Sequence, residues 1–331
     1  MMRVSVLGAG AWGTAIGRLF ALGGNDVVFF GLEESGESIN TRHVNETFFP
    51  DVVLPENVSY TTSLEKALGN AEAIVFAVPS KAYRQVARQV ESFLKSKVHV
   101  LSLAKGFDPD THERLSSVLR EEISPLHRHE IVSLLGPSYA EEVIHDLWTC
   151  LCACSKDVLE ANLFQELLSC PSFRVYTNTD EVGSEVSAAL KNVIAIASGI
   201  LEGLGGGDNA RAALVTRGNA EIMRLGMALG ARIETFLGLS GIGDLMLTCN
   251  SMKSRNFSLG YQIGKENDAK KVLMENTKTV EGVYTSKYVT EMAEKMGVDM
   301  PIVRAVYEVL FLGHKPSDKV GELMRRELKS E

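Results

Sequence analysis

The opening segment constrains the fold of this chain more than any other. Arg3–Leu7 is a short β-rich run, and it leads directly into the glycine pattern Gly8-Ala-Gly10-Ala-Trp-Gly13. A helix pattern follows over residues 14–22 and ends at a glycine pair. Strand, glycine turn and helix in this order form the fingerprint that holds the pyrophosphate of a dinucleotide.

Each glycine has its own role in such a turn. Gly8 allows the tight turn, Gly10 lets the backbone approach the pyrophosphate, and Gly13 lets the helix pack closely on the strand. The helix N-terminus offers amides and the positive end of its dipole to the phosphates. A second strand over 26–30 follows at the expected distance. We therefore predict dinucleotide binding here; the alternative is a glycine turn that binds nothing.

The order of apolar runs and helix patterns predicts two domains. Up to about residue 180, strands that are apolar on both faces alternate with helices, which indicates a mostly parallel sheet covered on both sides. From Glu181 onward only helix patterns remain. We expect an α/β, Rossmann-like domain over 1–180 and an all-α domain over 181–331. The later predicted strands are 73–78, 98–103, 131–135, 147–154 and 173–176, and the last predicted helix, 302–311, is ended by Gly313 and Pro316.

Composition limits the partners and the location. The chain has 331 residues, 45% of them hydrophobic and 23% charged, which is ordinary for a soluble globular protein. Its net charge of −8 argues against nucleic acid or an anionic membrane as the main partner. No charge-free stretch is long enough to span a membrane, and Met1-Met-Arg leads into the first strand without a signal peptide. We expect a cytoplasmic protein with reduced cysteines.

No metal site is predicted. Cys150, Cys152 and Cys154 alternate, and in a strand this spacing puts all three thiols on one face. They form no C-x2-C pair and have no histidine beside them, so we interpret them as small hydrophobic side chains of a buried strand. His127 and His129 lie in a polar, turn-like segment that is most simply a solvated loop.

A lysine interrupts the most apolar helix pattern of the second domain. Residues 186–200 are apolar almost all round, which indicates burial, yet they include Lys191 and Asn192. Burying an ammonium costs several kcal/mol unless it is paired or its pKa falls until it is neutral. Such a lysine can act as a general acid/base. The alternative is a lysine that snorkels to the surface, and the adjacent asparagine favours a site.

Loops after strands are the next candidates, because ligands of open α/β sheets bind at the carboxyl ends of strands. Pro79-Ser80 ends one strand, Lys105-Gly106 follows the next, and Gly136-Pro-Ser138 ends another and starts a helix. Each loop also has an interpretation without a ligand, since proline and glycine are common in turns and Lys105 can be a solvated loop residue. Together they predict a cleft shared with the glycine turn.

Two segments of the helical half place polar or charged side chains at helix starts. Asp244 follows a glycine-rich turn at a helix start, where a simple N-cap is the alternative. Ser254-Arg255-Asn256 precedes another helix, and an arginine with adjacent hydroxyl and amide groups at a helix start can receive a phosphate. Ser254 alone is equally well explained as a cap.

These residues lie in blocks that resemble the bacterial NAD(P)-dependent sn-glycerol-3-phosphate dehydrogenases, essentially end to end. The resemblance implies a soluble, usually homodimeric oxidoreductase that interconverts dihydroxyacetone phosphate and sn-glycerol 3-phosphate by hydride transfer and supplies phospholipid synthesis. The matching blocks are Gly8–Ala15, Ala104–Gly106, Gly136–Ala140, Leu190–Ile196, Ala210-Arg211, Leu214–Gly218, Gly241–Leu245, Leu247–Cys249, Ser254–Asn256 and Val280–Gly282.

The resemblance also implies roles for individual residues. Lys191 is similar to the family's catalytic acid/base, and Lys105 and Asp244 to its partners around the reacting oxygen. The positions that resemble further substrate contacts are Gly136, Ser138, Asn192, Thr248, Ser254, Arg255 and Asn256. Besides the glycines, the cofactor positions are Ala11, Trp12, Leu32, Lys105, Ala140, Arg255, Thr279 and Glu281.

Two positions depart from many relatives and bear on the cofactor. Ala11 replaces a frequent serine but keeps the backbone amide. Leu32 stands where members that favour NADP tend to carry Arg or His, and Glu33 and Glu34 would repel a 2′-phosphate. We therefore expect NAD(H) to be mildly favoured over NADP(H), unless a distant cation such as Arg42 reaches the ribose.

Two other functions remain as alternatives. The β-hydroxyacid dehydrogenases also combine a Rossmann domain with a helix-borne lysine, but they generally place an asparagine four residues later, where this chain has Ala195, and they lack the Ser-Arg-Asn block. A dinucleotide-binding regulator without catalysis is the second alternative. The presence of Lys191, Lys105 and Asp244 argues against it.

Overall fold

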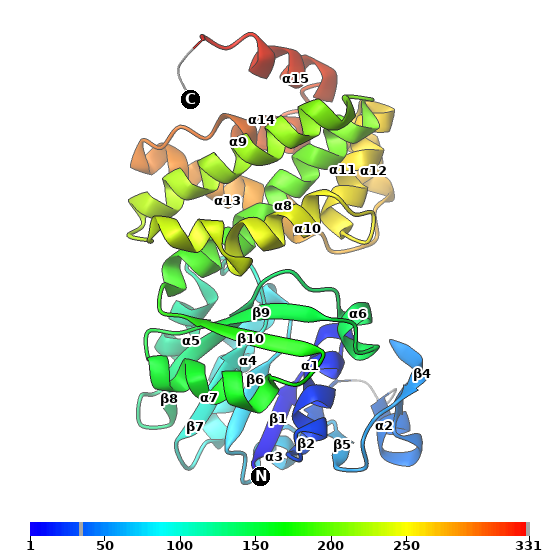
Figure 1. Ribbon diagram of the computed structural model, residues 1–331, viewed down its shortest axis with the longest axis vertical. Coiled ribbons are helices and arrows are strands. Elements are labelled where there is room, and N and C mark those ends of the chain that lie inside the picture. The colour runs from blue at the N-terminus through cyan, green and yellow to red at the C-terminus, as the bar shows by residue number, and fades with distance from the viewer. Residues whose placement is uncertain (33–35, 329–331) are drawn as a thin grey trace. The chain divides into compact units, whose positions relative to one another are not determined.

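The computed structural model describes residues 1–32 and 36–328, and the chain divides into two compact units, Met1–Glu181 and Val182–Glu331 (Figure 1). All strands of the described residues lie in the first unit, and the described part of the second unit is helical. A Rossmann-like α/β fold followed by an all-α part, as predicted, is confirmed.

An eight-stranded sheet forms the centre of the first unit. Its order is β10-β9-β8-β7-β6-β1-β2-β5, and neighbouring strands are parallel except for the antiparallel pair β8–β9. A mostly parallel sheet was the expectation and is confirmed. The strands are β1 (Arg3–Leu7), β2 (Asp26–Phe30), β5 (Val58–Thr61), β6 (Ala73–Phe76), β7 (Val98–Ser102), β8 (Arg128–Leu135), β9 (Thr149–Cys154) and β10 (Phe173–Asn178).

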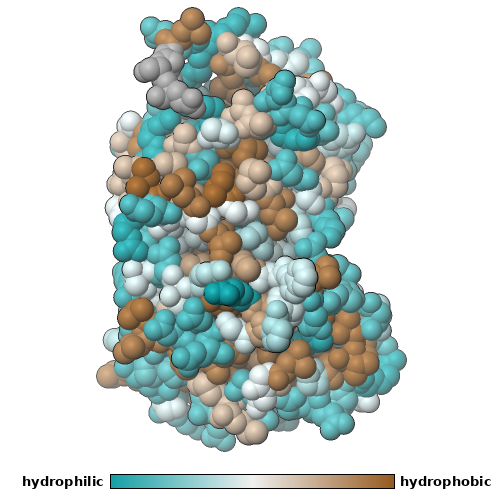
Figure 2. Space-filling view, viewed as in Figure 1, coloured by the Kyte–Doolittle hydropathy of each residue, from teal (hydrophilic) through white to brown (hydrophobic). Residues whose placement is uncertain are grey.

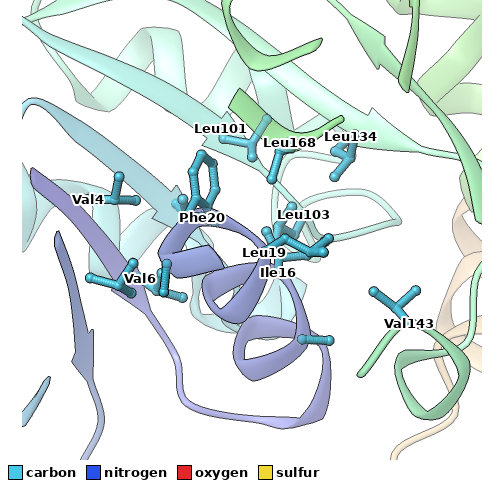
Figure 3. Close-up of a cluster of buried hydrophobic side chains, with 14 of the residues drawn as sticks. Val4, Val6, Ile16, Leu19, Phe20, Leu101, Leu103, Leu134, Val143 and Leu168 are labelled. Carbon is cyan, nitrogen blue, oxygen red and sulfur yellow. The ribbon is translucent and has the colours of Figure 1, made fainter. Parts of the chain in front are cut away.

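Helices cover both faces of the sheet, which is why its central strands are apolar on both sides. Val4 and Val6 of β1 point to one face, whereas Leu7 joins the core on the other. Figure 3 shows the first core, in which α1 (Ala11–Leu22) packs Ile16 and Phe20 against the sheet. The other helices of the unit are α2 (Glu37–Arg42), α3 (Leu64–Leu68), α4 (Tyr83–Phe93), α5 (Leu115–Glu122), α6 (Ala140–Ile144) and α7 (Val158–Leu168), with a 3-10 turn η2 (Ser80–Ala82).

Two sequence interpretations of this unit need correction. The segment at 128–129 is not a solvated loop, because β8 begins at Arg128 and pairs with β7. The short strands β3 (Val44–Asn45), β4 (Phe49–Val53) and β5 were not predicted. Their alternation is brief and β4 contains a proline, so periodicity alone gives no clear strand signal there.

In the second unit, α8 (Glu181–Gly203) packs closely against α11 (Arg255–Glu266). A Cβ atom at Gly199 would lie 2.1 Å from the Phe257 carbonyl oxygen, and one at Gly260 would lie 2.1 Å from that of Ile196. Only glycine allows this backbone approach. The remaining elements are α9 (Gly207–Ala228), η3 (Ile233–Leu237), η4 (Leu239–Gly243), α10 (Asp244–Cys249), α12 (Ala269–Glu275), α13 (Glu281–Met296), α14 (Pro301–Phe311) and α15 (Pro316–Met324).

The final helix was missed because Pro316 was interpreted only as a stop signal after Gly313. Pro316 is instead the first residue of α15, where proline's fixed φ suits a helix and its missing N–H has no intrahelical partner to lose.

One helix of the described residues, α8, is long and apolar enough to cross a membrane. However, 89% of its apolar window is buried inside the protein. A buried core helix has the same length and composition as a membrane span, and burial identifies α8 as such a core helix. On the face shown in Figure 2, polar residues are interspersed with hydrophobic ones, as is usual for a protein surface.

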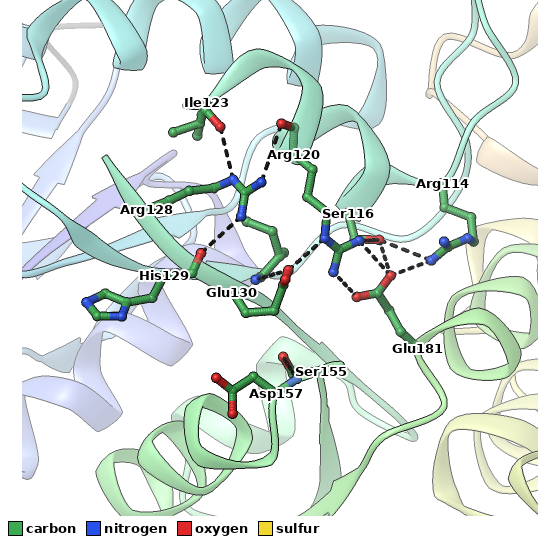
Figure 4. Close-up of polar contacts among 11 residues, drawn as sticks. Arg114, Ser116, Arg120, Ile123, Arg128, His129, Glu130, Ser155, Asp157 and Glu181 are labelled. Carbon is green, nitrogen blue, oxygen red and sulfur yellow. Dashed lines mark hydrogen bonds and ion pairs between the residues drawn. The ribbon is translucent and has the colours of Figure 1, made fainter. Parts of the chain in front are cut away.

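The first unit ends at a buried carboxylate that is held by two arginines. Arg114 Nη1 donates to Glu181 Oε1 at 2.6 Å, Ser116 Oγ donates to the same oxygen at 2.7 Å, and Arg120 pairs with both carboxylate oxygens (Figure 4). Burial alone would raise the pKa of Glu181, but the hydrogen bonds and charges of Arg120 and Arg114 lower it to about 2.

We expect this carboxylate to make the unfolding free energy depend on pH. Its pKa falls from 4.5 to about 2 on folding, so its contribution is present above pH 4.5 and is lost as the pH falls toward 2. Because each pKa unit corresponds to about 1.4 kcal/mol, that contribution is on the order of 3 kcal/mol. Thermal unfolding of Glu181→Gln should show a lower midpoint at pH 7 and a flatter acid limb. The same change at Glu121, whose side chain is 57% exposed, serves as control; equal profiles for both variants would contradict the prediction.

Candidate active site

The glycine turn has the geometry that a dinucleotide site requires. Gly8 has a φ of +114°, and a Cβ atom there would lie 2.8 Å from the Ala77 carbonyl oxygen. A Cβ atom at Gly13 would lie 2.1 Å from the carbonyl oxygen of Gly8. The turn and the close approach of α1 therefore both depend on glycine.

Gly10 instead faces open space. No atom lies within 4 Å of the position that its Cβ would occupy, and as the N-cap of α1 it supplies no side-chain acceptor. The first N–H groups of a helix have no intrahelical partner, so those near Ala11, Trp12 and Gly13 are suited to bind an anion. These residues fit the pyrophosphate of a nicotinamide dinucleotide.

Asn45 supports this turn and was not identified from the sequence. Its Nδ2 donates to the Ala9 carbonyl oxygen at 2.9 Å and to Thr14 Oγ1 at 2.8 Å. A lone asparagine in a two-residue strand gives no periodic signal, so only the folded structure brings it to the glycine turn.

Leu32, which follows β2, is the position at which the sequence predicted the cofactor preference. Leu32 is 88% exposed, while Glu33 and Glu34 lie outside the described residues. Arg42, the distant cation considered above, forms an ion pair with Glu46.

The loops after β7 and β8 meet within the first unit. Lys105 Nζ donates to the Gly136 carbonyl oxygen at 3.2 Å, and Ser138 Oγ donates to the same oxygen at 3.3 Å. Ala140 is the first residue of α6 and is partly buried. The structure therefore brings three of the predicted strand-end residues together.

In the second unit, Lys191 is buried and paired. It is 6% exposed, and its Nζ donates to Asp244 Oδ1 at 2.5 Å and to Thr248 Oγ1 at 2.9 Å. Asp244 is completely buried. Lys191 thus does not snorkel to the surface; the charge that an apolar helix buries is compensated by a carboxylate.

Asp244 follows a kinked turn and lies inside the helix, so it is not a simple N-cap. It is the first residue of α10, preceded by Gly243 and by η4, in which Gly241 has non-helical dihedral angles. Burial raises the pKa of the neighbouring Cys249 thiol to about 12. The surroundings of the ion pair are therefore poorly solvated, which strengthens its electrostatic interactions.

A second polar chain extends from Asn192. Asn256 Nδ2 donates to Asn192 Oδ1 at 3.0 Å, and Asn192 Nδ2 donates to Glu281 Oε2 at 3.4 Å. Asn256 Oδ1 accepts from the Gly282 N–H at 2.9 Å. These contacts connect α8, α11 and the start of α13.

Ser254 and Arg255 play different local roles. Ser254 is the N-cap of α11, and its Oγ accepts from the Phe257 N–H at 3.3 Å, as the simple cap interpretation expected. Arg255 is exposed and forms no ion pair with a described residue. Thr279, also exposed, lies just before α13. An unpaired guanidinium at a helix N-terminus suits an anionic ligand.

Comparisons with known proteins agree with these features. Residues 3–161 match the family described as NAD-dependent glycerol-3-phosphate dehydrogenase N-terminus, and residues 180–321 match its C-terminus counterpart. The glycerol-3-phosphate dehydrogenase (NAD(P)+) of Streptococcus agalactiae serotype V is 44% identical over 330 residues, with 99% of this chain and 98% of the relative covered. That of Enterococcus faecalis is 44% identical over 331 residues, with 99% and 97% covered.

A solved structure shows the same similarity in three dimensions. The glycerol-3-phosphate dehydrogenase of Coxiella burnetii matches with a TM-score of 0.91 and 32% sequence identity. The match covers 98% of this chain and 99% of that one.

Proposed function

The chain belongs to the NAD-dependent glycerol-3-phosphate dehydrogenase family, and from that premise we propose how its residues share the reaction. It is an NAD(P)-dependent oxidoreductase that interconverts dihydroxyacetone phosphate and sn-glycerol 3-phosphate. We propose that residues 1–180 form the domain that holds the pyrophosphate of the dinucleotide, and that residues 181–331 form the domain that carries proton transfer and holds the substrate phosphate.

Lys191 is the proposed acid/base, and its buried pairing with Asp244 and Thr248 is the observation that carries the proposal. During reduction its ammonium donates a proton to the carbonyl oxygen at C2; during oxidation the neutral amine accepts the proton of the C2 hydroxyl. Asp244 and Thr248 accept hydrogen bonds from Nζ at 2.5 and 2.9 Å and so fix its position. Lys105 supplies a second cation to the reacting oxygen, as the family resemblance implies.

The phosphate of the substrate is proposed to be held by Arg255, with Ser254 and Asn256 beside it. Its exposed guanidinium forms no ion pair with a described residue, so it can pair with a phosphate without breaking a salt bridge. The other proposed substrate contacts are Gly136, Ser138, Asn192 and Thr248, as the family resemblance implies.

The cofactor is proposed to place its pyrophosphate on the amides that follow Gly10, at the N-terminus of α1. When bound, its nicotinamide accepts or supplies the hydride of the reaction. Other proposed contacts are Gly8, Ala11, Trp12, Gly13, Leu32, Lys105, Ala140, Arg255, Thr279 and Glu281.

Oxidation of NADH in the presence of dihydroxyacetone phosphate tests the function directly. The protein should consume NADH at a rate that depends on this substrate and saturates with it. If it binds NADH but does not turn over, it is a regulator that has lost catalysis. Formation of sn-glycerol 3-phosphate should match NADH consumption.

We expect NADH to be used more efficiently than NADPH. Leu32 is exposed and uncharged, and the candidate cation Arg42 is paired with Glu46, so a 2′-phosphate gains no fixed partner there. The ratio of the two kcat/KM values measures the preference. Leu32→Arg should shift it toward NADPH by about tenfold or more, the effect of one charge-assisted hydrogen bond. Leu32→Gln, which adds no charge, is the control, and an unchanged ratio in Leu32→Arg would show that position 32 is not at the ribose.

The remaining proposals concern the protein as a whole. We propose that it acts as a cytoplasmic homodimer that supplies glycerol phosphate for phospholipid synthesis, as the family resemblance implies. Light scattering should then give twice the chain mass of 36.1 kDa. A mass of one chain at working concentrations would contradict the dimer and leave the catalytic proposal standing.

A further inference from the structure

A cluster of potential metal ligands lies in the first unit, away from the residues discussed above. His99 of β7, His129 of β8 and Glu160 of α7 each offer one ligand atom, and these atoms all lie within 4.8 Å of one another. His99 Nδ1 is 2.8 Å from Glu160 Oε2, and His129 Nδ1 is 3.3 Å from Glu160 Oε1.

The sheet topology explains how these residues meet. Val98 pairs with Arg128 but Val100 pairs with Ile131, so β8 carries an extra residue where the two histidines adjoin. This bulge brings His99 and His129 side by side, with ring centroids 4.2 Å apart and planes 11° from parallel. Both histidines lie at the amino ends of their strands. Lys105 and Gly136 follow the carboxyl ends of the same strands, at the opposite edge of the sheet.

Burial distinguishes this cluster from an ordinary surface ion pair. The Glu160 side chain is 10% exposed, whereas those of His99 and His129 are 23% and 35% exposed. One buried carboxylate therefore contacts two imidazoles that are partly exposed to solvent. His127 offers a contrast, because its Nδ1 lies 2.8 Å from Glu91 Oε1 and it does not belong to this group of ligand atoms.

The spacing suits a small transition-metal ion. Zinc binds histidine nitrogen and carboxylate oxygen at about 2.0–2.2 Å, so its ligand atoms lie about 3.3 Å apart in tetrahedral geometry. The two nitrogen-to-oxygen distances, 2.8 and 3.3 Å, lie at or somewhat below that value, so a small separation of the side chains brings the ligand atoms to it. Two imidazoles with one carboxylate favour zinc-type ions, whereas magnesium and calcium favour oxygen ligands.

We propose that His99, His129 and Glu160 bind a divalent zinc-type ion, with water completing the coordination. The ion replaces the present contacts of both imidazoles with Glu160 and requires the two stacked rings to splay, which their broad χ2 rotation permits. Because its ligands come from β7, β8 and α7, the bound ion ties this helix to the sheet. Its role is structural, and it takes no part in the reaction proposed above.

Co²⁺ titration of the whole protein, purified with a chelator and then freed of it, tests the proposal. We expect one ion per chain with the visible d–d bands of low-coordinate Co²⁺, no thiolate charge-transfer band, and displacement by Zn²⁺. Zn²⁺ should also raise the thermal midpoint, since binding to the folded state stabilises it by mass action. Turnover with saturating NADH should not change.

Matched variants separate this site from chance binding. His99→Asn and His129→Asn should each weaken Co²⁺ binding more than about 100-fold, because losing even an outer-shell partner weakens a metal site 10- to 100-fold. His127→Asn, which removes a histidine from a single His–Glu pair, should bind as the parent protein does. Unfolding without metal shows whether each variant is folded.

Three results would overturn the proposal. The first is a parent protein that shows neither Co²⁺ bands nor a shift of the thermal midpoint with Zn²⁺. The second is a thiolate charge-transfer band in the Co²⁺ spectrum. The third is a loss of Co²⁺ affinity in His127→Asn as large as that in the His99 and His129 variants. If the His99 and His129 variants misfold, Glu160→Gln, which keeps the size of the side chain, takes their place. If Glu160→Gln keeps the full Co²⁺ affinity of the parent protein, the proposal is overturned.

Discussion

Replacement of Lys191 by alanine should abolish nearly all turnover while NADH binding stays close to normal. Proton transfer by a positioned side chain is typically worth about 10²–10⁴-fold in rate, and alanine cannot donate or accept the proton. Lys191 is not among the cofactor contacts proposed above, so we expect NADH binding not to depend on this ammonium. Steady-state kcat and fluorescence titration with NADH measure the two effects. A variant that keeps more than a tenth of the parent rate would refute the acid/base assignment.

The same substitution has a structural effect that must be measured separately. Removing the ammonium breaks the ion pair between Lys191 and Asp244, whose carboxylate is completely buried. Breaking a buried ion pair in this way typically destabilises a protein by about 3–5 kcal/mol. The double variant Lys191→Met/Asp244→Asn removes both charges and should recover much of the lost stability. It should remain inactive, which separates loss of proton transfer from loss of folding.

Arg255→Ala should weaken the use of dihydroxyacetone phosphate far more than that of dihydroxyacetone, which lacks the phosphate. A charge-assisted hydrogen bond contributes about 1.5–3 kcal/mol, so kcat/KM for the phosphorylated substrate should fall about 10- to 100-fold, mainly through KM. Arg255 is exposed at the start of α11, so we expect this loss without a large effect on folding.

Two further variants test whether the effect of Arg255→Ala comes from loss of a phosphate contact. Arg255→Lys should restore part of the affinity, because an ammonium keeps the charge but loses the bidentate geometry. Arg304→Ala, an arginine of the same unit that is 57% exposed and paired with Glu294, should leave both substrates unaffected. If Arg255→Ala lowers kcat/KM equally for both substrates, the arginine supports the structure and does not read the phosphate.

Sequence patterns predicted those parts of the fold that follow from local periodicity and glycine chemistry. The turn at Gly8–Gly13 and the burial of Lys191 are of this kind, because a fixed spacing or a single charge in an apolar helix carries the information. Arg255 was proposed as a phosphate ligand in the same way, from its hydroxyl and amide neighbours at a helix start, and that role stays a prediction.

Other features depend on residues far apart in the chain. Asn45 reaches the glycine turn only through tertiary folding, and the capping interpretation of Asp244 failed because a π-type turn shifts the helix start by one residue. His129 was assigned to a loop because its polar neighbours hide the amino end of β8, which begins at Arg128. Its partner Glu160 is 31 residues further along the sequence and on another element, so no local pattern connects them.

β1 is the first strand of the chain but an interior strand of the sheet. It pairs with β2 on one side and with β6 on the other, so during synthesis it is available before both of the strands that flank it. The sheet then grows through β7, β8 and β9 until β10 closes that edge. Until Phe173–Asn178 has emerged, β9, whose side chains from Leu151 to Cys154 are buried in the finished protein, is an open apolar edge. A nascent chain halted before that point exposes a template for aggregation, which the last strand removes just as the helical unit begins.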